Sequence, residues 1–375
     1  MKKTKNYFLI YILIMSLFSC AKSEFKTLEF APDKEFYFPN VRIKSIIELE
    51  TNDSCLIGKI SKIRILPKSI LILDNFKSRG LFVFNYEGKF VAKTNVGKGP
   101  GEVSYPWDFI IDEQNQTITL WESSNFNMMD FDYNLNFKKA EKYQGLYLHS
   151  MEKIDEEHLL VSSQSPPYIP QIDEDDKSLP YNYFIYKKGF SELVSKLLPT
   201  KDDLCCFNPD VPICRTNRIL FLTSIDFHIY TLNNYKPQIV YKLDFGKLTL
   251  TKSDMNKGSD YISNQINIGN KVGFLDNLFE NEQFISFSFG RRFNDYFYIH
   301  SKKTGMNYYS ESFFRNRVLP RCQIKGILND GTFLAIVNAQ DLKDFLPENN
   351  KYNIQLQRVN EFDNDFILYF SIDEN

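Results

Sequence analysis

Short apolar stretches separated by polar turns recur along most of this chain. Residues 70–94 hold one such series, with ILILDN, GLFVFNYEG and KFVAKT in order. Residues 117–141 repeat it as TITLWES, FNMMDFDYN and LNFKKAE, and residues 219–243 repeat it as ILFLTS, FHIYTLNN and QIVYKL. Runs of this length, rich in β-branched and aromatic residues and bounded by turn residues, are typical of β-strands. The pattern therefore predicts a repeated unit built from short strands.

Six such units can be counted, and each begins with one further apolar stretch. These first strands lie at residues 60–66, 107–113, 147–155, 211–217, 272–280 and 321–330. The second strands start near Leu71, Ile118, Leu160, Leu220, Ile285 and Phe333. Most of these intervals fall in the range of about 40–50 residues that four-stranded propeller repeats occupy. Two longer intervals leave room for insertions, one of them at residues 164–181, and short helices are expected within 251–271 and 340–360.

The last unit has only three strands before the chain ends, whereas residues 41–50 (VRIKSIIELE) form a strand with no unit of their own. Placed as the outer strand of the last unit, they would bring residue 45 close to residue 368 and leave no open edge. We therefore predict an all-β fold over residues 41–375, a six-bladed β-propeller of four-stranded antiparallel blades closed by an N-terminal strand. A β-sandwich, or two smaller β domains, is the alternative.

The N-terminus has the features of a signal peptide. Lysines at positions 2, 3 and 5 precede a short apolar stretch, residues 8–18. The sequence Leu17-Phe18-Ser19-Cys20 then resembles a bacterial lipobox, which implies that residues 1–19 are removed and Cys20 is acylated. Residues 20–40 would be the lipid anchor and tether, since several acyl chains hold a protein stably on a membrane. An ordinary secretory signal or an N-terminal membrane anchor is the alternative.

Such an anchor predicts a protein of the cell envelope, facing the periplasm, on the outer membrane rather than the inner. The net charge of −2 provides no basic excess for a nucleic-acid partner. The 34 Phe and 22 Tyr residues suit the wide gaps between blades. Five cysteines remain besides Cys20. Cys205 or Cys206 could form a disulfide with Cys214, and Cys55 and Cys322 are expected to be buried thiols.

The glycine-rich stretch VGKGPGEVSYPWDF (residues 96–109) connects the first unit to the second. A phosphate-binding loop would need a helix directly after it, but a strand follows. Gly97, Gly99 and Gly101 are therefore expected to supply positive φ in a loop from rim to hub. The stretch is similar to the G-x-G-P-G-E…P-x-D-F-x-I-D signature of the six-bladed β-propeller lipoproteins of Gram-negative bacteria, relatives of NHL-repeat and TolB-like propellers. The resemblance is most specific over residues 57–140, and it implies a lipid-anchored propeller without an established activity.

No catalytic residues are predicted, because the four histidines do not fall into one group. His149 lies on a predicted inner strand and could face the channel, whereas His228 and His300 lie on third strands. Five acidic residues next to turns could line one face or merely fix those turns. They are Asp74, Asp108, Glu122, Asp226 and Asp276.

Two patches are candidate binding sites. Arg291 and Arg292 stand beside Phe293, a combination typical of binding hot spots. Lys98, Glu102 and Trp107 form the second patch, where the glycine-rich loop meets an inner strand.

Two classes of function are compatible with these features. The first is a membrane-anchored binding or scaffold protein that holds a protein, peptide or glycan partner. The second is a propeller hydrolase or lyase of the lactonase type, with a metal ion at the channel mouth. No cofactor is expected for the first class, and calcium would be the metal in the second. Three or more carboxylate and amide groups converging on the axis would favour the enzyme.

Overall fold

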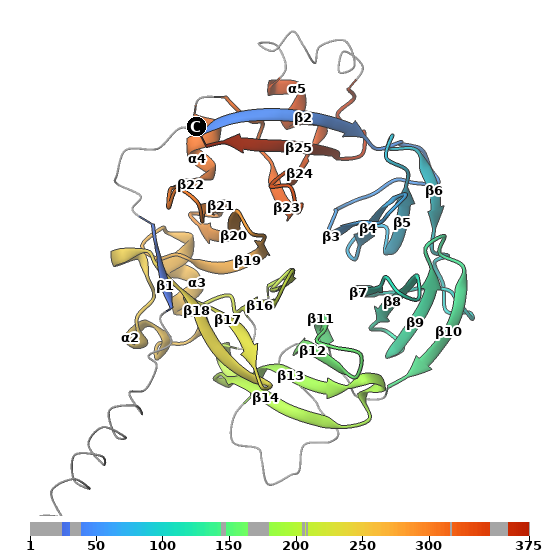
Figure 1. Cartoon of the computed structure of the whole chain (residues 1–375), viewed down its shortest axis with the longest axis horizontal. Coiled ribbons are helices and arrows are strands. Elements are labelled where there is room, and N and C mark those ends of the chain that lie inside the picture. The colour runs from blue at the N-terminus through green and yellow to red at the C-terminus, as the bar shows by residue number, and fades with distance from the viewer. Residues whose placement is uncertain are drawn as a thin grey trace, which may run out of the picture.

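The structure is a computed structural model that describes residues 25–30, 39–143, 148–163, 180–204, 207, 209–315, 317–345 and 359–374. Six antiparallel sheets stand around a central axis, as Figure 1 shows in a view down that axis. The predicted six-bladed β-propeller is therefore confirmed. In every blade the consecutive strands run outward from the axis, so that the first of them is innermost. Two further strands from the N-terminal segment pair with the outer edges of two blades.

The first three blades each contain four consecutive strands. Blade 1 consists of β3 (Lys62–Ile65), β4 (Ile70–Asp74), β5 (Gly80–Phe84) and β6 (Phe90–Lys93). Blade 2 consists of β7 (Pro106–Asp112), β8 (Thr117–Glu122), β9 (Asn127–Asp132) and β10 (Phe137–Lys142). Blade 3 consists of β11 (Leu148–Lys153), β12 (His158–Ser163), β13 (Tyr181–Lys187) and β14 (Leu193–Pro199).

The other three blades follow the same plan with additions. Blade 4 consists of β15 (Ile213–Arg215), β16 (Ile219–Leu222), β17 (His228–Asn233) and β18 (Lys236–Asp244). Blade 5 consists of β19 (Gly273–Glu280), β20 (Phe284–Arg291), β21 (Asn294–Ser301) and β22 (Asn307–Tyr309). Blade 6 consists of β23 (Gln323–Ile327), β24 (Phe333–Val337), β25 (Phe366–Asp373) and β2 (Asn40–Glu48).

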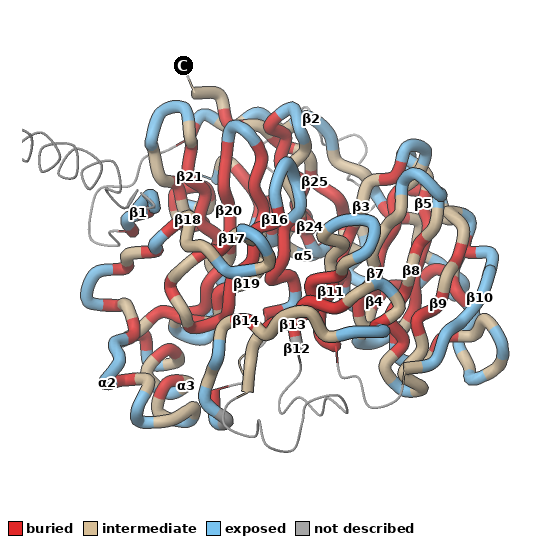
Figure 2. The backbone as a smooth tube through the Cα atoms, turned by 60° about the horizontal axis from the view of Figure 1, so that its bottom comes forward, coloured by how far each residue is buried: buried red, intermediate tan, exposed pale blue. Residues whose placement is uncertain are grey.

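The core lies between neighbouring blades, where the second and third strands are buried on both sides. All five residues of β4 and all five of β5 are buried, and Figure 2 shows buried strands joined by exposed turns. Aromatic rings fill the widening gaps between blades. The Phe333 ring lies 5.0 Å from Phe284 in the preceding blade and stacks 5.0 Å from Phe370 within its own blade. This packing explains the high Phe and Tyr content.

The ring closes as the sequence predicted. β2 pairs antiparallel with β25, so that Ser45 lies opposite Tyr369 and Ile46 lies opposite Leu368. β2 is the outermost strand of the sixth blade. The edge of the last blade is thus covered by a segment from the start of the chain.

The structure adds a strand that the sequence pattern did not predict. β1 (Lys26–Glu29) lies within the segment expected to be the tether and pairs in parallel with β18, as a fifth strand of the fourth blade. Cys20 and the rest of the predicted signal peptide lie outside the described residues. Among the residues that are described, no helix is long and apolar enough to cross a membrane.

Helices occur where the insertions were predicted, with one correction. α2 (Lys252–Met255) and α3 (Ser259–Asn267) fall within 251–271, and α5 (Ala339–Phe345) lies in the last insertion. The sequence pattern also predicts NYYSES (residues 307–312) as the fourth strand of the fifth blade, but this strand, β22, ends at Tyr309. The chain continues as α4 (Ser310–Phe314), which buries Phe313 against Phe297. Residues 164–179, most of the other predicted insertion, lie outside the described part of the chain.

Antiparallel strands alternate in direction, so the connections before each inner strand and those between second and third strands reach the same face. This face, called here the long-connection face, carries α2, α3, α4 and α5. The opposite face carries short turns, such as residues 66–69 and 113–116. Binding residues usually lie on long connections held by a rigid scaffold. A binding site is therefore expected on the long-connection face.

Candidate functional site

The inner strands are joined near the axis by buried polar contacts. Lys62 Nζ donates to Asp108 Oδ1 at 2.6 Å, and Asp108 Oδ2 accepts from the Met151 backbone N–H at 2.8 Å. Burial lowers the pKa of Lys62, whereas the Asp108 carboxylate opposes that shift. Asp108 therefore ties blades 1, 2 and 3 together, and both of its oxygens are engaged.

Two of the other predicted acidic residues fix turns. Burial alone would raise the pKa of Asp74, but backbone N–H donors, including those of Ser78 and Gly58, lower it overall. Glu122 accepts in the same way from the backbone N–H groups of Tyr105 and Asn125. The turn interpretation is thus correct for these two residues.

Asp226 and Asp276 have different surroundings. Asp226 contacts His228 Nδ1 at 2.6 Å and also accepts from the Tyr230 hydroxyl, so its partners lie on the following strand. Asp276 lies on an inner strand near the axis and accepts from the Val211 N–H at 2.7 Å.

A cavity of about 360 Å³ opens at the channel mouth on the long-connection face, beside Asp276. β19 is irregular here: its pairing with β20 shifts register on both sides of Asp276, and Phe274 and Asn277 have φ of 52° and 48°. Such backbone conformations are costly for residues other than glycine and concentrate at functional sites.

Two charged groups of opposite sign line this cavity, Lys325, which is buried, and Asp276, which is half-buried. Lys325 Nζ donates to Asn277 Oδ1 at 3.2 Å. Burial lowers the pKa of Lys325, opposed by Asp276 and Asp210. Burial, together with the charge of Asp210, raises the pKa of Asp276 to about 6. Perturbed groups that face each other in a cavity are typical of binding or catalytic sites.

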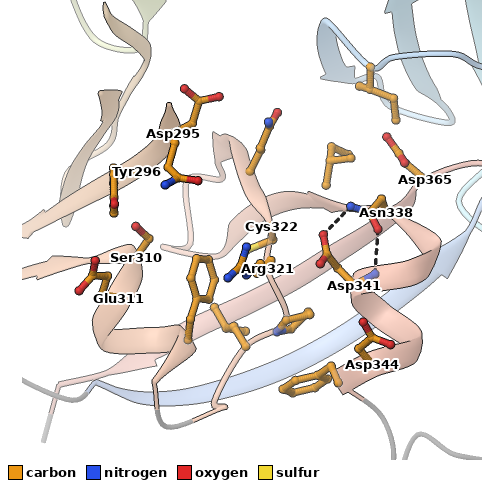
Figure 3. Close-up of a pocket in the computed structure, with 18 of the residues that line it drawn as sticks. Asp295, Tyr296, Ser310, Glu311, Arg321, Cys322, Asn338, Asp341, Asp344 and Asp365 are labelled. Atoms are coloured by element: carbon orange, nitrogen blue, oxygen red, sulfur yellow. Dashed lines mark hydrogen bonds between the residues drawn. The ribbon is translucent and has the colours of Figure 1, made fainter. Parts of the chain in front are cut away.

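The channel-mouth cavity adjoins a larger cleft of about 910 Å³ between the fifth and sixth blades. Residues that line both include Lys59, Asp295 and Tyr296. Figure 3 shows α4 and α5 on opposite sides of this cleft, with Arg321 and Cys322 between them. The two hollows therefore form one continuous depression, called here the cleft.

The two walls of the cleft carry opposite charges. Arg315, Arg317 and Arg321 lie on the connection from α4 to β23, where Arg315 pairs with Glu311 of α4 at 3.2 Å, so this wall is positive overall. Asp341 and Asp344 lie on α5, where the Asp341 backbone N–H donates to Asn338 Oδ1 at 2.8 Å (Figure 3). A cleft with walls of opposite charge suits a ligand that carries both signs.

Three polar groups of the cleft have incomplete partners in the described part of the chain. Arg321 is exposed and makes no hydrogen bond or ion pair there. The hydroxyl of Ser310 is fully buried and has no hydrogen-bond partner among the described residues. Burial raises the pKa of Asp365 to about 6. Buried polar groups are normally satisfied, so a bound ligand is one explanation for the unpaired Ser310 hydroxyl, and Arg321 is an exposed cation within reach of such a ligand.

The patch predicted at Lys98, Glu102 and Trp107 is not assembled as a common surface. Lys98 is exposed, Glu102 Oε2 accepts from the Gly99 N–H at 2.8 Å, and Trp107 Nε1 donates to His149 Nδ1 at 2.9 Å. His149 is thus buried against Trp107 and lines neither of the two hollows described above. A binding role for Lys98, Glu102 and Trp107 stays a prediction.

The glycines of the same loop differ from the expectation. The loop does run from β6 to β7, but only Gly101 has a positive φ, of 78°. A Cβ on Gly97 would lie 2.0 Å from Glu102 Oε2, and one on Gly99 would lie 3.0 Å from it. These two glycines therefore make room for the Glu102 side chain instead of supplying a left-handed conformation.

The patch predicted at Arg291 and Arg292 borders the cleft. Arg291 Nε donates to the Gly269 carbonyl at 3.0 Å, and Arg292 packs over the same glycine, just after α3. Next to them Phe293 is 82% exposed, has a φ of 59° and lines the cleft. A role for the two arginines in binding stays a prediction. Arg321 and Ser310 were missed, because no local sequence pattern marks them.

The cysteines that the structure describes are free thiols. Cys55 and Cys214 are buried and Cys322 is partly buried. Burial raises the pKa of Cys214 to about 11, and its Sγ accepts from the Glu280 N–H at 3.2 Å. The disulfide considered for Cys214 is therefore not formed in this structure, and its candidate partners, Cys205 and Cys206, lie outside the described residues.

Within the described ranges, no three His, Cys, Asp or Glu side chains are grouped in a way that could hold a metal ion. Asp108 and Asp276, two of the acidic residues near the axis, are engaged by Lys62 and by backbone N–H groups. Calcium binding stays a prediction to be tested.

The ring of blades and the cleft on one face define the class of this protein, a six-bladed β-propeller with a ligand-sized depression beside its channel mouth. The chain belongs to the family described as "Domain of unknown function (DUF4934)", whose model matches residues 41–371. That match covers far more of the chain than the signature at residues 57–140. No curated protein matches the chain.

Solved structures with the same fold come from Bacteroides. A Bacteroides fragilis protein predicted to be exported has a TM-score of 0.74 and 19% identity, covering 94% of this chain and 100% of its own. A member of the DUF4221 family from Bacteroides vulgatus has a TM-score of 0.55 and 8% identity, covering 90% of this chain and 100% of its own. At these identities the likeness shows the fold alone.

Proposed function

We propose that this protein is a lipid-anchored binding propeller of the cell envelope, whose cleft holds a peptide segment of a partner protein. The N-terminal sequence supports the anchor, through the apolar stretch and the lipobox that ends at Cys20. The similarity of the fold to a Bacteroides fragilis protein predicted to be exported supports the location. The resemblance of residues 57–140 to propeller lipoproteins favours an anchor on the outer membrane, with the propeller in the periplasm.

The observation that carries the proposal is the cleft itself. The larger of its two hollows has a volume of about 910 Å³, near the upper end of the range for ligand sites. Its walls carry opposite charges, and Arg321 and Ser310, which lack partners among the described residues, offer hydrogen-bond donors. A peptide supplies backbone carbonyls, charges of both signs and apolar side chains, and Phe293 provides an exposed ring at the rim. A peptide therefore matches each of these features.

The experiment places a photoreactive benzoylphenylalanine at Phe293 in the full chain, expressed in its native membrane. The matched control carries the same group at Tyr86, which is exposed in a turn of the opposite face. We expect a discrete protein adduct at Phe293 that is absent at Tyr86 and is lost when Arg321→Glu is added. Equal adducts at both positions, or adducts at Phe293 to a glycan only, would overturn the peptide assignment.

A further inference from the structure

The N-terminal segment is bound to the side of the propeller by β1. Leu28 lies opposite Leu243 of β18 and is buried. The Phe30 N–H donates to the Asp244 carbonyl at 2.8 Å, which extends the pairing beyond the strand. The chain is therefore attached to the fourth blade only a few residues after the predicted lipid site.

Phe30 fixes this attachment to the fifth blade as well. Its ring is 9% exposed and lies among four other aromatic rings, with centroid distances of 5.1 to 6.5 Å. These rings belong to Phe245, Phe289, Tyr298 and Tyr309. The neighbouring Glu29 carbonyl accepts from Asn307 Nδ2 at 3.0 Å and from the Tyr298 hydroxyl at 3.3 Å. We call β1 with Phe30 the N-terminal clamp.

The clamp limits how far the propeller can move from an anchor at Cys20. Only residues 21–25 separate Cys20 from Lys26. Even a fully extended chain spans about 3.3–3.6 Å per residue, so the distance from the lipid to β1 is at most about 20 Å. This is shorter than the width of a protein of this size, so one side of the propeller must stay close to the membrane.

We propose that the clamp orients the propeller edge-on, with the β18 rim against the lipid headgroups. The β18 rim is defined as β1, β18 and α2. Figure 1 shows β1 and β18 across the ring from β10, which would point away from the membrane. The axis then lies parallel to the membrane plane, so the long-connection face and its cleft open sideways to the periplasm. This inference rests on the lipid anchor in the proposed function.

The charges of the rim agree with this orientation. Lys236, Lys242 and Lys252 are exposed on β18 and α2, and their side chains have no ion pair among the described residues. Anionic headgroups attract lysines held close to a membrane surface. Lysines alone do not distinguish this rim, because the exposed strand β10 also carries Lys138, Lys139 and Lys142. The reach of the tether is what separates the two rims.

The test uses the full lipidated chain in vesicles of phosphatidylethanolamine and phosphatidylglycerol. A photoreactive benzoylphenylalanine replaces Lys242 on β18 in one variant and Lys142 on β10 in the other. Both positions are exposed lysines without an ion pair in the described structure; Lys142 lies on the outermost strand of its blade, and Lys242 lies on the strand next to β1. We expect at least a tenfold larger yield of lipid adduct at position 242. Similar yields at the two positions in acylated protein would overturn the proposed orientation.

Two further variants separate the clamp from the anchor. A flexible twenty-residue insertion between Ser23 and Glu24 leaves the clamp intact and lengthens the tether, so it should reduce the difference between the rims. Phe30→Ser should do the same by releasing the clamp, provided that circular dichroism shows a folded chain. An unchanged tenfold difference with the long tether would contradict the tether argument. Mass spectrometry that shows no acylation at Cys20 would instead overturn the anchor, and with it that part of the proposed function.

Discussion

Lys62 Nζ lies 2.6 Å from Asp108 Oδ1, and both side chains are almost fully buried at the junction of the first and second blades. The other oxygen of Asp108 accepts from the backbone N–H of Met151 in the third blade. One carboxylate thus holds the inner strands of three blades in place. This arrangement explains why an acidic residue on an inner strand need not be catalytic.

Replacing this carboxylate should destabilise the propeller strongly. Asp108→Ala leaves a buried ammonium group and a buried N–H without their carboxylate partner, which costs about 3–5 kcal/mol. Asp108→Asn keeps an acceptor and should cost less. The control is Arg42→Ala, because Arg42 is mostly exposed in its pair with Asp373 and should contribute about 0–1 kcal/mol. Urea unfolding measures all three, and a loss below about 1 kcal/mol for Asp108→Ala would contradict this role.

Two glycines with positive φ allow the cost of a left-handed backbone to be compared with the cost of a steric clash. Gly101 has a φ of 78°, and a Cβ there would lie 2.9 Å from the Phe137 ring. Gly305 has nearly the same φ, of 75°, but nothing within 4 Å of such a Cβ. Both alanine variants should lose about 1 kcal/mol from the left-handed backbone, and Gly101→Ala should lose more. Equal losses in the free energy of unfolding would show that the contact with Phe137 is unimportant.

Asp365 at the wall of the cleft should make stability depend on pH. Burial raises its pKa to about 6, with Asp341 raising it further and Lys325 opposing the shift. An acid with a raised folded pKa contributes stability that is complete below the unfolded value near 4 and is lost as the pH rises through 6.

Asp365→Asn should therefore be more stable than the wild type at pH 8, by on the order of 2–3 kcal/mol, and similar to it at pH 4. The difference between the two proteins in urea unfolding, measured from pH 4 to 8, cancels the other titrating groups. A difference that does not change over this range would show that Asp365 keeps an ordinary pKa.

Calcium binding distinguishes the two classes of function, the binding protein and the metal-dependent hydrolase or lyase. Within the described residues no acidic cluster could hold the ion, so we expect no heat of binding in calorimetric titration of the mature chain. The melting temperature should also be the same with millimolar calcium and with chelator. Saturable binding with a rise in melting temperature, lost in Asp276→Asn, would favour the enzyme.

The blades could be predicted from the sequence because each one carries its own apolar strands and polar turns. The closure could be predicted because the last unit lacks a strand and residues 41–50 form a strand without a unit. The strand β1 could not, since it is four residues long and its burial comes from blades 4 and 5, more than 200 residues away. Helix α4 was missed because the stretch NYYSES contains no Gly or Pro that would mark the end of the strand at Tyr309.

The cleft could not be predicted from local sequence patterns, for a different reason. Ser310 and Arg321 lie on the connection between β22 and β23, and Asp365 lies on the connection between β24 and β25; the two connections meet only when the fifth and sixth blades pack together. Asp74 and Asp108 likewise have similar sequence contexts, at strand ends. Only the structure shows that the first fixes a turn, while the second binds a lysine at the inner ring.

The closed ring is the central claim, because the α5 wall of the cleft belongs to the blade that β2 completes. Its most direct test is a pair of engineered cysteines. Ser45 and Tyr369 lie opposite each other in the β2–β25 pairing, whereas Ser371 lies opposite Arg42. Directly opposite residues have Cβ atoms about 4.5–5.5 Å apart, close enough for a disulfide after small shifts, and diagonal neighbours are too far apart.

We predict that Ser45→Cys with Tyr369→Cys forms a disulfide on mild oxidation, identified by peptide mass spectrometry, and raises the melting temperature. The control, Ser45→Cys with Ser371→Cys, should remain reduced under the same conditions. If the first pair stays reduced, or both pairs form the bond equally well, β2 does not close the ring in this register and the account is wrong.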